Sequence, residues 1–319
     1  MGAPCARRKQ QRDVAGILLL DKPTGITSNA ALQRAKRCFQ ARKAGHTGSL
    51  DPLASGMLPL CFGHATKVSG MLLEADKVYE VEAVIGTQTD TADADGVVVQ
   101  KAGEHEVTPA LLAAAISAHL GTISQVPPMY SALKHRGRRL HELAREGIEV
   151  ERPPRRVQIH SIEVARFDPV RPRLRVQCSK GTYIRTLVET LAAHMGTLAH
   201  VGALRRLWVE PFETAPMVSL AEIERLAGNH DALDAHLLGA DAALPQLPPV
   251  QLDARSCQHL AHGRPVPEAR ERCPGYTGLV RAYGPNQRFL GVAELLDDGR
   301  LVVRRLFDRG ATVLPAAKS

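Results

Sequence analysis

The alternation of apolar and polar residues predicts several short elements in the first two thirds of the chain. Residues 78–85 alternate with a period of two, which is typical of a strand with one buried face. Residues 184–195 place apolar side chains at helical spacing, and Gly196 stands where a helix commonly ends, so we expect an amphipathic helix there. The apolar run within 16–23 predicts a buried strand that ends in a turn.

Weaker patterns fill the rest of this region. Thr27 or Ser28 can cap a helix with Leu32, Ala35 and Phe39 on its apolar face. We also expect a helix over 108–120 and a strand over 173–180. Residues 45–66 are rich in glycine and small side chains, which predicts an irregular loop followed by a short helix.

A change in the sequence pattern, from longer elements to short apolar runs separated by turns, marks a domain boundary near residue 245. Residues 244–249 form a proline-rich linker, and three short apolar runs follow at 278–282, 289–296 and 301–307. Asp298-Gly299 between the last two is a strong hairpin signal. The end of the chain is therefore predicted to be a compact, mainly β module.

Composition narrows the class of protein. The chain has 319 residues, of which 44% are hydrophobic and 23% charged, so a wholly disordered chain is excluded. No apolar run approaches the roughly 18 residues that a membrane span needs, and the N-terminus lacks the apolar core of a signal peptide. We therefore expect a cytoplasmic protein without a membrane association.

The positive charge is unevenly distributed. Residues 1–43 hold ten Lys and Arg against two Asp and Glu, and residues 134–156 hold eight against four. Separate basic clusters suit a polyanion, because each neutralised phosphate releases counterions. This pattern favours a nucleic-acid partner over the alternative of a merely solvated basic tail.

The cysteines and histidines give no metal signal. Six cysteines show no C-x-x-C pair, as expected for reduced thiols in the cytosol. The Cys257-x-His259-x-x-His262 cluster lacks a fourth ligand and follows no familiar zinc spacing. Residues 89–96 hint at a calcium loop, but Thr91 would stand at the first ligand position and Ala102 at the last, where a bidentate Glu is needed, so we interpret them as a charged, capped turn.

The segment 45–56 is the densest candidate for chemistry. Its glycines allow a ligand to approach closely, and Asp51 is a lone carboxylate there that could act as nucleophile or base if a cation offset its burial. The alternative is structural, with Asp51 capping a helix over 52–58 whose first residue is Pro52.

A second candidate lies where the predicted strand 173–180 leads into the predicted helix. Tyr183 and Arg185 stand at this junction, where side chains and free N–H groups converge. Tyr183 and Tyr79 could stack on a nucleobase, although each of them alone is more often a core residue. Arg185 could instead pair with Glu189 one helical turn later.

Together these segments resemble the bacterial tRNA pseudouridine-55 synthase family. The motifs that carry the resemblance occur in the family's order between residues 16 and about 210: LLLDKP-x-G at 18–25, AGHTGSLDPLASGMLP at 44–59, K-x-Y at 77–79, TDT-x-D-x-DG at 89–96, PMYSALK at 128–134, CSKGTYIR at 178–185 and LRRL at 204–207. The region after residue 250 resembles the family's small RNA-binding β-barrel.

The resemblance implies a fold and a division into domains. The fold would be α/β, with a mixed, largely antiparallel sheet and flanking helices, followed by a small PUA-like β-barrel. A basic mobile tail would cover 1–13, the catalytic domain 14–245 with a basic RNA-clasping insertion at about 105–156, and the RNA-binding module 250–315.

It also implies an activity and its residues. The family isomerises uridine 55 in the T-loop of tRNA by breaking its N-glycosidic bond and rejoining the base through carbon, with no cofactor and no metal. Asp51 matches the essential aspartate, Tyr79 the tyrosine that stacks on the base and takes part in proton transfer, and Arg185 the arginine that pairs with the aspartate. The residues that match substrate-binding positions are His46, Tyr79, Tyr183, Leu204 and Lys22. The expected partner is the T-arm of tRNA, bound by a monomer that needs no protein partner.

Two other classes of protein remain as alternatives. A protein that binds and folds tRNA without catalysis would have no need of the Asp51, Tyr79 and Arg185 set. A glycoside or nucleoside hydrolase is disfavoured because no second positioned acid is evident.

Overall fold

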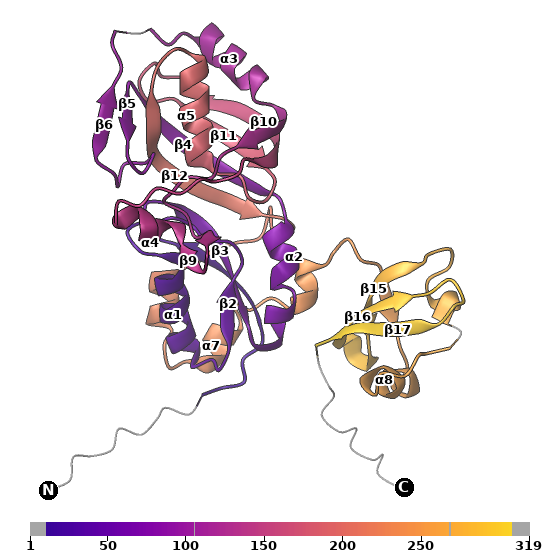
Figure 1. The fold of residues 1–319 in the computed structure, drawn as a ribbon. Coiled ribbons are helices and arrows are strands. Elements are labelled where there is room, and N and C mark those ends of the chain that lie inside the picture. The colour runs from indigo at the N-terminus through magenta and orange to yellow at the C-terminus, as the bar shows by residue number, and fades with distance from the viewer. Residues whose placement is uncertain (1–10, 105, 268, 308–319) are drawn as a thin grey trace, which may run out of the picture.

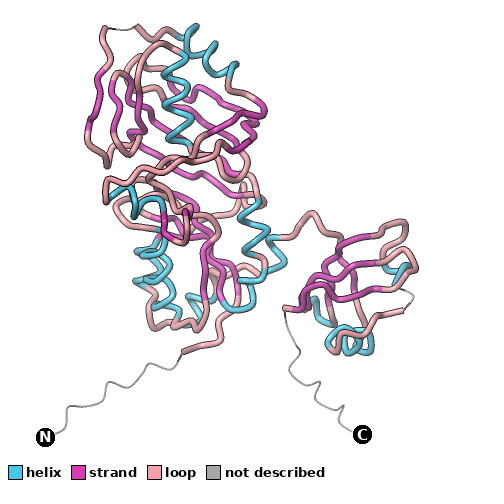
Figure 2. The backbone as a smooth tube through the Cα atoms, viewed as in Figure 1, coloured by secondary structure: helices cyan, strands magenta, loops and turns pink. Residues whose placement is uncertain are grey.

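Nine strands of the described chain form one mixed sheet, at the centre of the larger body in Figures 1 and 2. The computed structural model describes residues 11–104, 106–267 and 269–307. The strand order is β13-β1-β3-β12-β4-β11-β10-β7, with β2 paired to β3. The bounds are β1 Gly16–Lys22, β2 Ala44–His46, β3 Ser55–Phe62, β4 Lys77–Ile85, β7 Gly121–Gln125, β10 Arg155–Arg166, β11 Arg173–Cys178, β12 Ala199–Val209 and β13 Val218–Ser219.

The sheet is largely antiparallel, as predicted. Only the β1–β13 and β12–β3 pairs among its described strands are parallel. The strand predicted over 78–85 is confirmed as β4, whose residues 79, 81, 83 and 85 are buried while Glu80 and Glu82 are less so. The strands predicted over 16–23 and 173–180 are confirmed as β1 and β11.

Apolar side chains from the two faces of the sheet enter two separate cores. In β1, Leu18 and Leu20 join one core while Ile17 and Leu19 join the other, because successive residues point to opposite faces. The first core includes buried residues of α1 (Ser28–Phe39), α3 (Pro109–Ala118), α5 (Ile184–His194), α6 (Leu220–Arg225) and α7 (His230–Asp234). The second core includes Leu72 of α2 (Ser69–Glu74). The central strands are therefore apolar on both faces.

The predicted helices agree with the structure at their ends. Thr27 caps α1 by accepting from Ala30 N, and Thr108 caps α3 by accepting from Leu111 N. Helix α5 ends at His194, and Gly196 follows with a φ of +76°, the conformation expected for a glycine that closes a helix.

The prediction for residues 45–66 is wrong. Strands β2 and β3 occupy 44–46 and 55–62, and only a short 3-10 turn, Gly63–Lys67, follows. Strand β3 is buried from Gly56 onward because Leu58 and Leu60 enter the first core and Met57 and Cys61 the second, so its apolar residues form a continuous run without alternation. Such a run cannot be distinguished from a helix by its period, and Pro59 argues further against a strand.

The basic segment folds into small elements of its own. Strands β8 (Lys134–His135) and β9 (Arg138–Arg139) form a hairpin that leads into α4 (Leu140–Arg145). Lys134, Arg136, Arg138 and Arg139 are all exposed on it. A further hairpin, β5 (Thr87–Thr89) with β6 (Val98–Lys101), extends from the end of β4.

The C-terminal module is β-rich, as predicted. Strands β14 (Pro249–Gln251), β15 (Gly278–Tyr283), β16 (Phe289–Leu295) and β17 (Leu301–Leu306) form a second sheet, which packs with α8 (Ala254–Ala261) around a core of its own. The hairpin predicted at Asp298-Gly299 joins β16 to β17, and Gly299 has a φ of +83°. Residues 308–315 of the predicted module lie outside the described residues.

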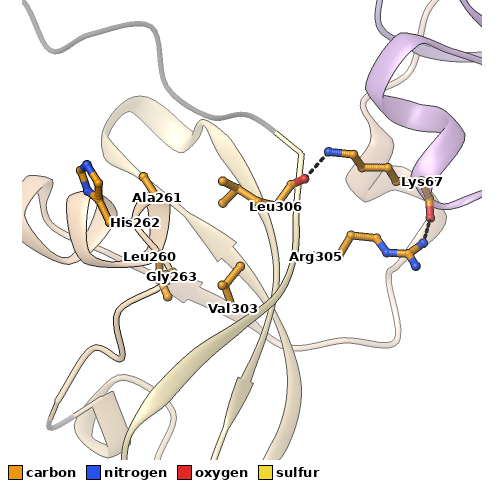
Figure 3. Close-up of a pocket in the computed structure, with 8 residues that line it drawn as sticks. All are labelled: Lys67, Leu260, Ala261, His262, Gly263, Val303, Arg305 and Leu306. Atoms are coloured by element: carbon orange, nitrogen blue, oxygen red, sulfur yellow. Dashed lines mark hydrogen bonds between the residues drawn. The ribbon is translucent and has the colours of Figure 1, made fainter.

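Direct contacts join this module to the larger body (Figure 3). Lys67 Nζ donates to the carbonyl of Leu306, and Arg305 donates to the carbonyl of Lys67. Phe307 and Val292 are part of the second core, and Tyr283 donates to Asp241 at 2.8 Å. The groove in Figure 3 is lined by Lys67, Leu260, Ala261, His262, Gly263, Val303, Arg305 and Leu306.

Residues 1–10 of the predicted mobile tail lie outside the described residues, as does Cys5. Within the described part of the predicted tail, Arg12 forms an ion pair of 2.5 Å with Asp234 of α7. Among the described cysteines, Cys38, Cys61, Cys178 and Cys273 are thiols that form no disulfide. Among the described helices, none has the length and apolar character that crossing a membrane requires.

Candidate active site

The loop between β2 and β3 carries Asp51. Ser28 of α1 fixes this loop by donating to the carbonyl of Leu50 at 3.0 Å and accepting from its N–H at 2.7 Å. Gly48 has a φ of +87°, a conformation that favours glycine. No helix begins at Pro52, because β3 starts three residues later. The helix-capping alternative for Asp51 is therefore excluded.

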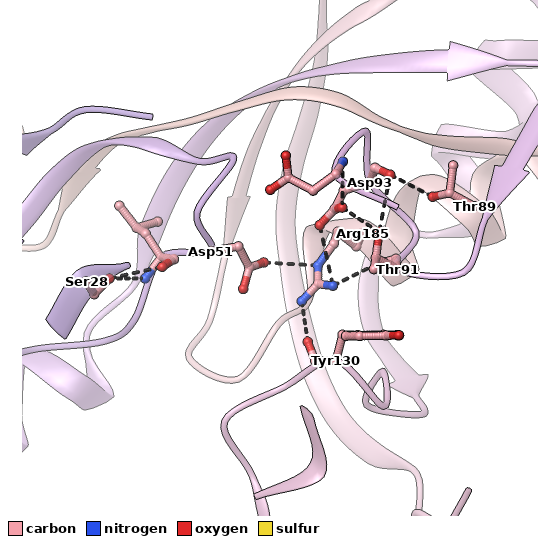
Figure 4. A network of polar contacts seen from close by, with 9 residues as sticks. Ser28, Asp51, Thr89, Thr91, Asp93, Tyr130 and Arg185 are labelled. Atoms are coloured by element: carbon pink, nitrogen blue, oxygen red, sulfur yellow. Dashed lines mark hydrogen bonds and ion pairs between the residues drawn. The ribbon is translucent and has the colours of Figure 1, made fainter. Parts of the chain in front are cut away.

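Arg185 lies in the first turn of α5 and points at Asp51 (Figure 4). Its Nε is 3.0 Å from Asp51 Oδ2. Its two terminal nitrogens donate to the carbonyls of Thr91 at 2.8 Å and Tyr130 at 2.7 Å. The alternative partner, Glu189, accepts instead from Gln88 Nε2 at 3.0 Å. The structure thus brings Asp51 and Arg185 together across the fold.

Asp93 is a second carboxylate beside the same guanidinium, and sequence reasoning missed this role. Its Oδ2 lies 3.6 Å from Arg185 Nη1. Its Oδ1 accepts from Thr91 Oγ1 at 2.6 Å and from Asp95 N at 3.2 Å, which closes the turn predicted for residues 89–96. The local sequence gives no sign of this contact, because Arg185 lies 92 residues further along the chain.

The electrostatics of Asp51 balance burial against two cations. Burial raises the pKa of the Asp51 carboxyl, the Arg185 charge lowers it, Asp93 raises it, and Lys22 lowers it. Because the side chain keeps 39% of its surface exposed, a ligand can reach the carboxylate. The arrangement provides a desolvated but accessible oxygen nucleophile or base with its counterion already in place.

Three of the predicted substrate-binding residues lie on the sheet or at the start of α5. They are Tyr79, Leu204 and Tyr183. Tyr79 on β4 faces Arg206 of β12, and Leu204 is paired with Val81, two residues further along. Tyr183 precedes α5, where Gln125 holds its backbone by accepting from its N–H at 3.0 Å. Burial raises the pKa of both tyrosines, and the charge of Asp51 acts on both.

His46 is on β2, with a buried Nδ1 that has no hydrogen-bond partner among the described residues. Burial lowers the pKa of this imidazole, and the charges of Arg206 and Arg139 lower it further. The ring is therefore neutral at pH 7 and can donate or accept a hydrogen bond. Arg139 belongs to the β8–β9 hairpin, so that hairpin lies close to the site.

Lys22, which the resemblance places among the substrate-binding residues, lies buried next to the loop that carries Asp51. Its side chain has no exposed surface, and Nζ donates to the carbonyls of Pro23 at 2.9 Å, Ile26 at 2.8 Å and Pro52 at 3.5 Å. Burial lowers its pKa to about 8, with Asp51 acting in the opposite direction. Because the carbonyl of Pro52 belongs to the loop that carries Asp51, these hydrogen bonds position that loop.

Arg206 is the second residue that sequence reasoning left without a role. Its side chain is 1% exposed, and it donates from Nε to the carbonyl of Met57 at 2.7 Å and from Nη2 to that of Gly48 at 3.2 Å. The sequence alone gives no signal for it, because its burial beside the better exposed Arg205 depends on the strand register. Within the described ranges, no cluster of three or more His, Cys, Asp or Glu could hold a metal ion.

Comparison with known proteins places these residues in a family. The model described as TruB family pseudouridylate synthase (N terminal domain) matches residues 36–184. The tRNA pseudouridylate synthase B C-terminal domain matches 185–245, and the pseudouridine synthase II TruB C-terminal model matches 248–307.

Curated relatives match almost the whole chain. One from Stutzerimonas stutzeri strain A1501, named tRNA pseudouridine synthase B, is 50% identical over 303 residues, which is 94% of this chain and 97% of the relative. Another of the same name, from Nitrosococcus oceani, is 48% identical over 301 residues, again 94% of this chain and 97% of the relative.

Solved structures share the fold. A chain of a Cbf5-Nop10-Gar1 complex superposes with a TM-score of 0.68 at 24% identity, covering 92% of this chain and 85% of that one. A chain of an H/ACA RNP bound to a substrate RNA containing 2′-deoxyuridine also gives 0.68, at 20% identity, with 95% and 92% covered. At these identities the similarity concerns the fold alone.

Proposed function

The chain belongs to the TruB family of pseudouridylate synthases, and we propose that it converts uridine 55 in the T-loop of tRNA to pseudouridine with Asp51 as its catalytic carboxylate. It is an isomerase that acts on tRNA, as its relatives are named for doing. The observation that carries the assignment of Asp51 is its 3.0 Å pair with Arg185, a residue 134 positions away that has almost no exposed surface.

The reaction sets clear demands on the site. The N1–C1′ bond breaks, a C5–C1′ bond forms, one proton leaves C5 and one arrives at N1, so the product has the atoms of the substrate. An anionic oxygen beside the sugar can either attack C1′ or promote elimination, and the Asp51 carboxylate is suited to both. Because nothing is oxidised or transferred to a second molecule, the reaction does not require a cofactor.

We assign the remaining contacts from the geometry around Asp51. Tyr79 offers an aromatic face to the extruded base and a hydroxyl for proton transfer, while Tyr183 and Leu204 complete the wall. A base inside a folded loop must swing out before it can react, and an aromatic pocket offsets part of that cost. His46 is placed to contact the RNA beside the extruded nucleotide. Lys22 positions the loop from below.

The tRNA arm would be held by basic segments outside this pocket. Exposed cations gather on the β8–β9 hairpin, which lies close to His46, and phosphate contacts from such residues fix the register of an RNA without reading its sequence. We assign residues 14–245 to the catalytic domain, with the insertion at about 105–156, and 250–315 to an RNA-binding module. The enzyme would act as a cytoplasmic monomer.

Mapping pseudouridine at single-nucleotide resolution tests the function. An unmodified tRNA transcript incubated with the purified chain should gain pseudouridine at position 55 and nowhere else. A transcript with cytidine at position 55 is the matched control and should remain unchanged. Modification at another position, or none at all, would overturn the proposed substrate.

A further inference from the structure

A guanidinium without a carboxylate partner lies in the core beneath the site. Arg206 heads the fully buried side chains of the described residues by volume, and no ion pair found among those residues involves it. Its hydrogen bonds go to the backbone carbonyls of Met57 and Gly48. A buried charge without a counterion is costly even when it is hydrogen-bonded, which makes Arg206 a candidate for a role in the site.

The charge faces Tyr79. Residues 206 and 79 are directly opposite in the β12–β4 register, and opposite residues in an antiparallel pair project from the same face of the sheet. Both side chains are buried, at 1% and 8% exposure. Of the charged and titratable groups around the phenol, Cys178 of β11 and Asp51 of the catalytic loop favour its neutral form, while Arg206 favours its anion.

The same guanidinium holds the catalytic loop. Gly48, whose carbonyl it binds, stands three residues before Asp51, and Met57 stands six residues after it. A side chain at Gly48 would start only 3.5 Å from Arg206 Nη1, so loop and guanidinium are in close contact. Arg206 is thus joined to both ends of the loop and faces the tyrosine across the sheet.

We propose that Arg206 is a positioning residue that fixes the Asp51 loop and stabilises the anionic oxygen of Tyr79 as it takes the proton from C5. The inference rests on the proposed function. The phenolate oxygen accepts the C5 proton, the electrons of that C–H bond form C5=C6, and the C6=N1 pair moves to N1, which takes a proton from solvent. The phenol then returns its proton to solvent, so the step balances.

The charge reaches beyond Tyr79. Arg206 also acts on Lys22 of β1, His46 of β2, Lys77 of β4 and Cys178 of β11, in each case lowering the pKa. Lys22 and Lys77 each have a pKa of about 8, so a rate followed across that range reports several groups at once. A readout confined to Tyr79 is therefore needed.

Titration of Tyr79 by ¹³C NMR provides a readout that is confined to this residue. With tyrosine labelled at Cζ, the Tyr79 signal is assigned by its disappearance in Tyr79→Phe, and the pH at which it begins to shift is followed from pH 8 to 12 in the full chain without RNA. Arg206→Gln keeps a hydrogen-bond donor but removes the charge, so Tyr79 in this variant should titrate at higher pH than Tyr79 in the unaltered chain. Arg206→Lys keeps the charge, so Tyr79 in that variant should titrate at nearly the same pH as in the unaltered chain.

The matched control is Arg205→Gln, because Arg205 is adjacent, pairs with Asp21 at 2.8 Å and is 39% exposed on its side chain. Its Tyr79 should titrate as in the unaltered chain. If Arg206→Gln does not fold, Arg206→Met takes its place in the experiment, because it also removes the charge and does so without introducing an amide. A Tyr79 signal that moves equally in all variants, or in none, would overturn the proposal.

Single-turnover rates at pH 7.5 give the second measurement. We expect the Arg206→Gln rate to fall tenfold for each unit by which the titration shows the Tyr79 pKa to rise, since the phenolate fraction falls by that factor. Arg206→Lys should retain most of the rate, and equal losses in the two variants would overturn the charge role. Absence of any pseudouridine with the unaltered chain would remove the proposed function instead, and would leave the titration result standing.

Discussion

At the scale of single residues, the site is organised around one shared cation. Arg185 contacts both Asp51 and Asp93, and two backbone carbonyls complete its set of acceptors. Because Arg185 is shared by two carboxylates, it neutralises the negative charge of Asp51 less fully than it would in an isolated ion pair. This keeps the carboxylate reactive while preventing it from being held only as a structural ion.

The pH dependence follows from that geometry. Burial raises the pKa of Asp51, so the acidic limb of the single-turnover rate should lie above the ordinary range of an aspartate. Arg185 lowers that pKa, so Arg185→Gln should displace the limb to still higher pH, and Arg185→Lys should displace it less. Measuring rate against pH for the three forms checks the order, and an unmoved limb in Arg185→Gln would contradict the electrostatic role of the pair.

Tyr79 allows its ring and its hydroxyl to be separated. Tyr79→Phe keeps the aromatic surface on β4, so tRNA affinity should change by less than about threefold, since stacking does not need the hydroxyl. Single-turnover rate should fall at least about a hundredfold if the oxygen transfers the proton. A rate equal to that of the unaltered chain would rule out proton transfer at this position.

Sequence analysis identified the residues that stand in recognisable catalytic motifs. It missed the residues that contribute only by contacting those side chains in the folded protein. Local patterns left Asp51, Tyr79 and Arg185 each with a structural alternative, and the family resemblance supplied their roles. The structure brings the three together. Arg206 and Asp93 could not be placed, because their roles depend on strand register and on a contact across 92 residues. Neither is visible in local spacing.

At the scale of elements, periodicity decided which predictions succeeded. Strand β4 and helix α5 have one buried face each, so their patterns repeat at 2 and 3.6 residues. Strand β3 is covered on both faces and shows no alternation, which is why its segment was mispredicted. A central strand cannot be recognised until its neighbours are known.

Close approach of β3 and β12 provides a test of that central position. A methyl group at Gly56 would lie 2.1 Å from the carbonyl oxygen of Arg206, and the glycine has a φ of +99°. Gly56→Ala should therefore lower the free energy of unfolding by about 2–3 kcal/mol or more. Urea denaturation measures it. Gly70→Ala on the exposed side of α2, where nothing lies within 4 Å, is the control and should stay within about 1 kcal/mol of the unaltered chain.

The β8–β9 hairpin should contribute mainly electrostatic affinity. Lys134 and Arg136 are exposed on it, and replacing both by alanine should weaken tRNA binding. The slope of log K against log salt should fall by about one for each phosphate that the variant no longer neutralises. Arg225→Ala on α6, whose guanidinium pairs with Glu222, is the matched control. An unchanged slope in the double variant would remove the hairpin from the RNA interface.

At the scale of the whole molecule, a shared core connects the catalytic body to the C-terminal module. Phe289 and Phe307 pack with their ring centroids 5.2 Å apart, and Lys67 lies over the Phe307 ring at 5.7 Å. Because Phe307 is buried within the second core, the module is fixed to the face of the sheet opposite α1 and α5. An RNA bound by both parts would therefore meet a preset geometry.

Release of tritium from tRNA labelled at C5 of its uridines tests the central role of Asp51 most directly. The unaltered chain and Asp231→Asn, a control on the exposed side of α7, should release tritium at the same rate. Asp51→Asn should bind the same tRNA with similar affinity and release none. Tritium release by Asp51→Asn at a rate within tenfold of the control would contradict the assignment of this carboxylate to the chemical step.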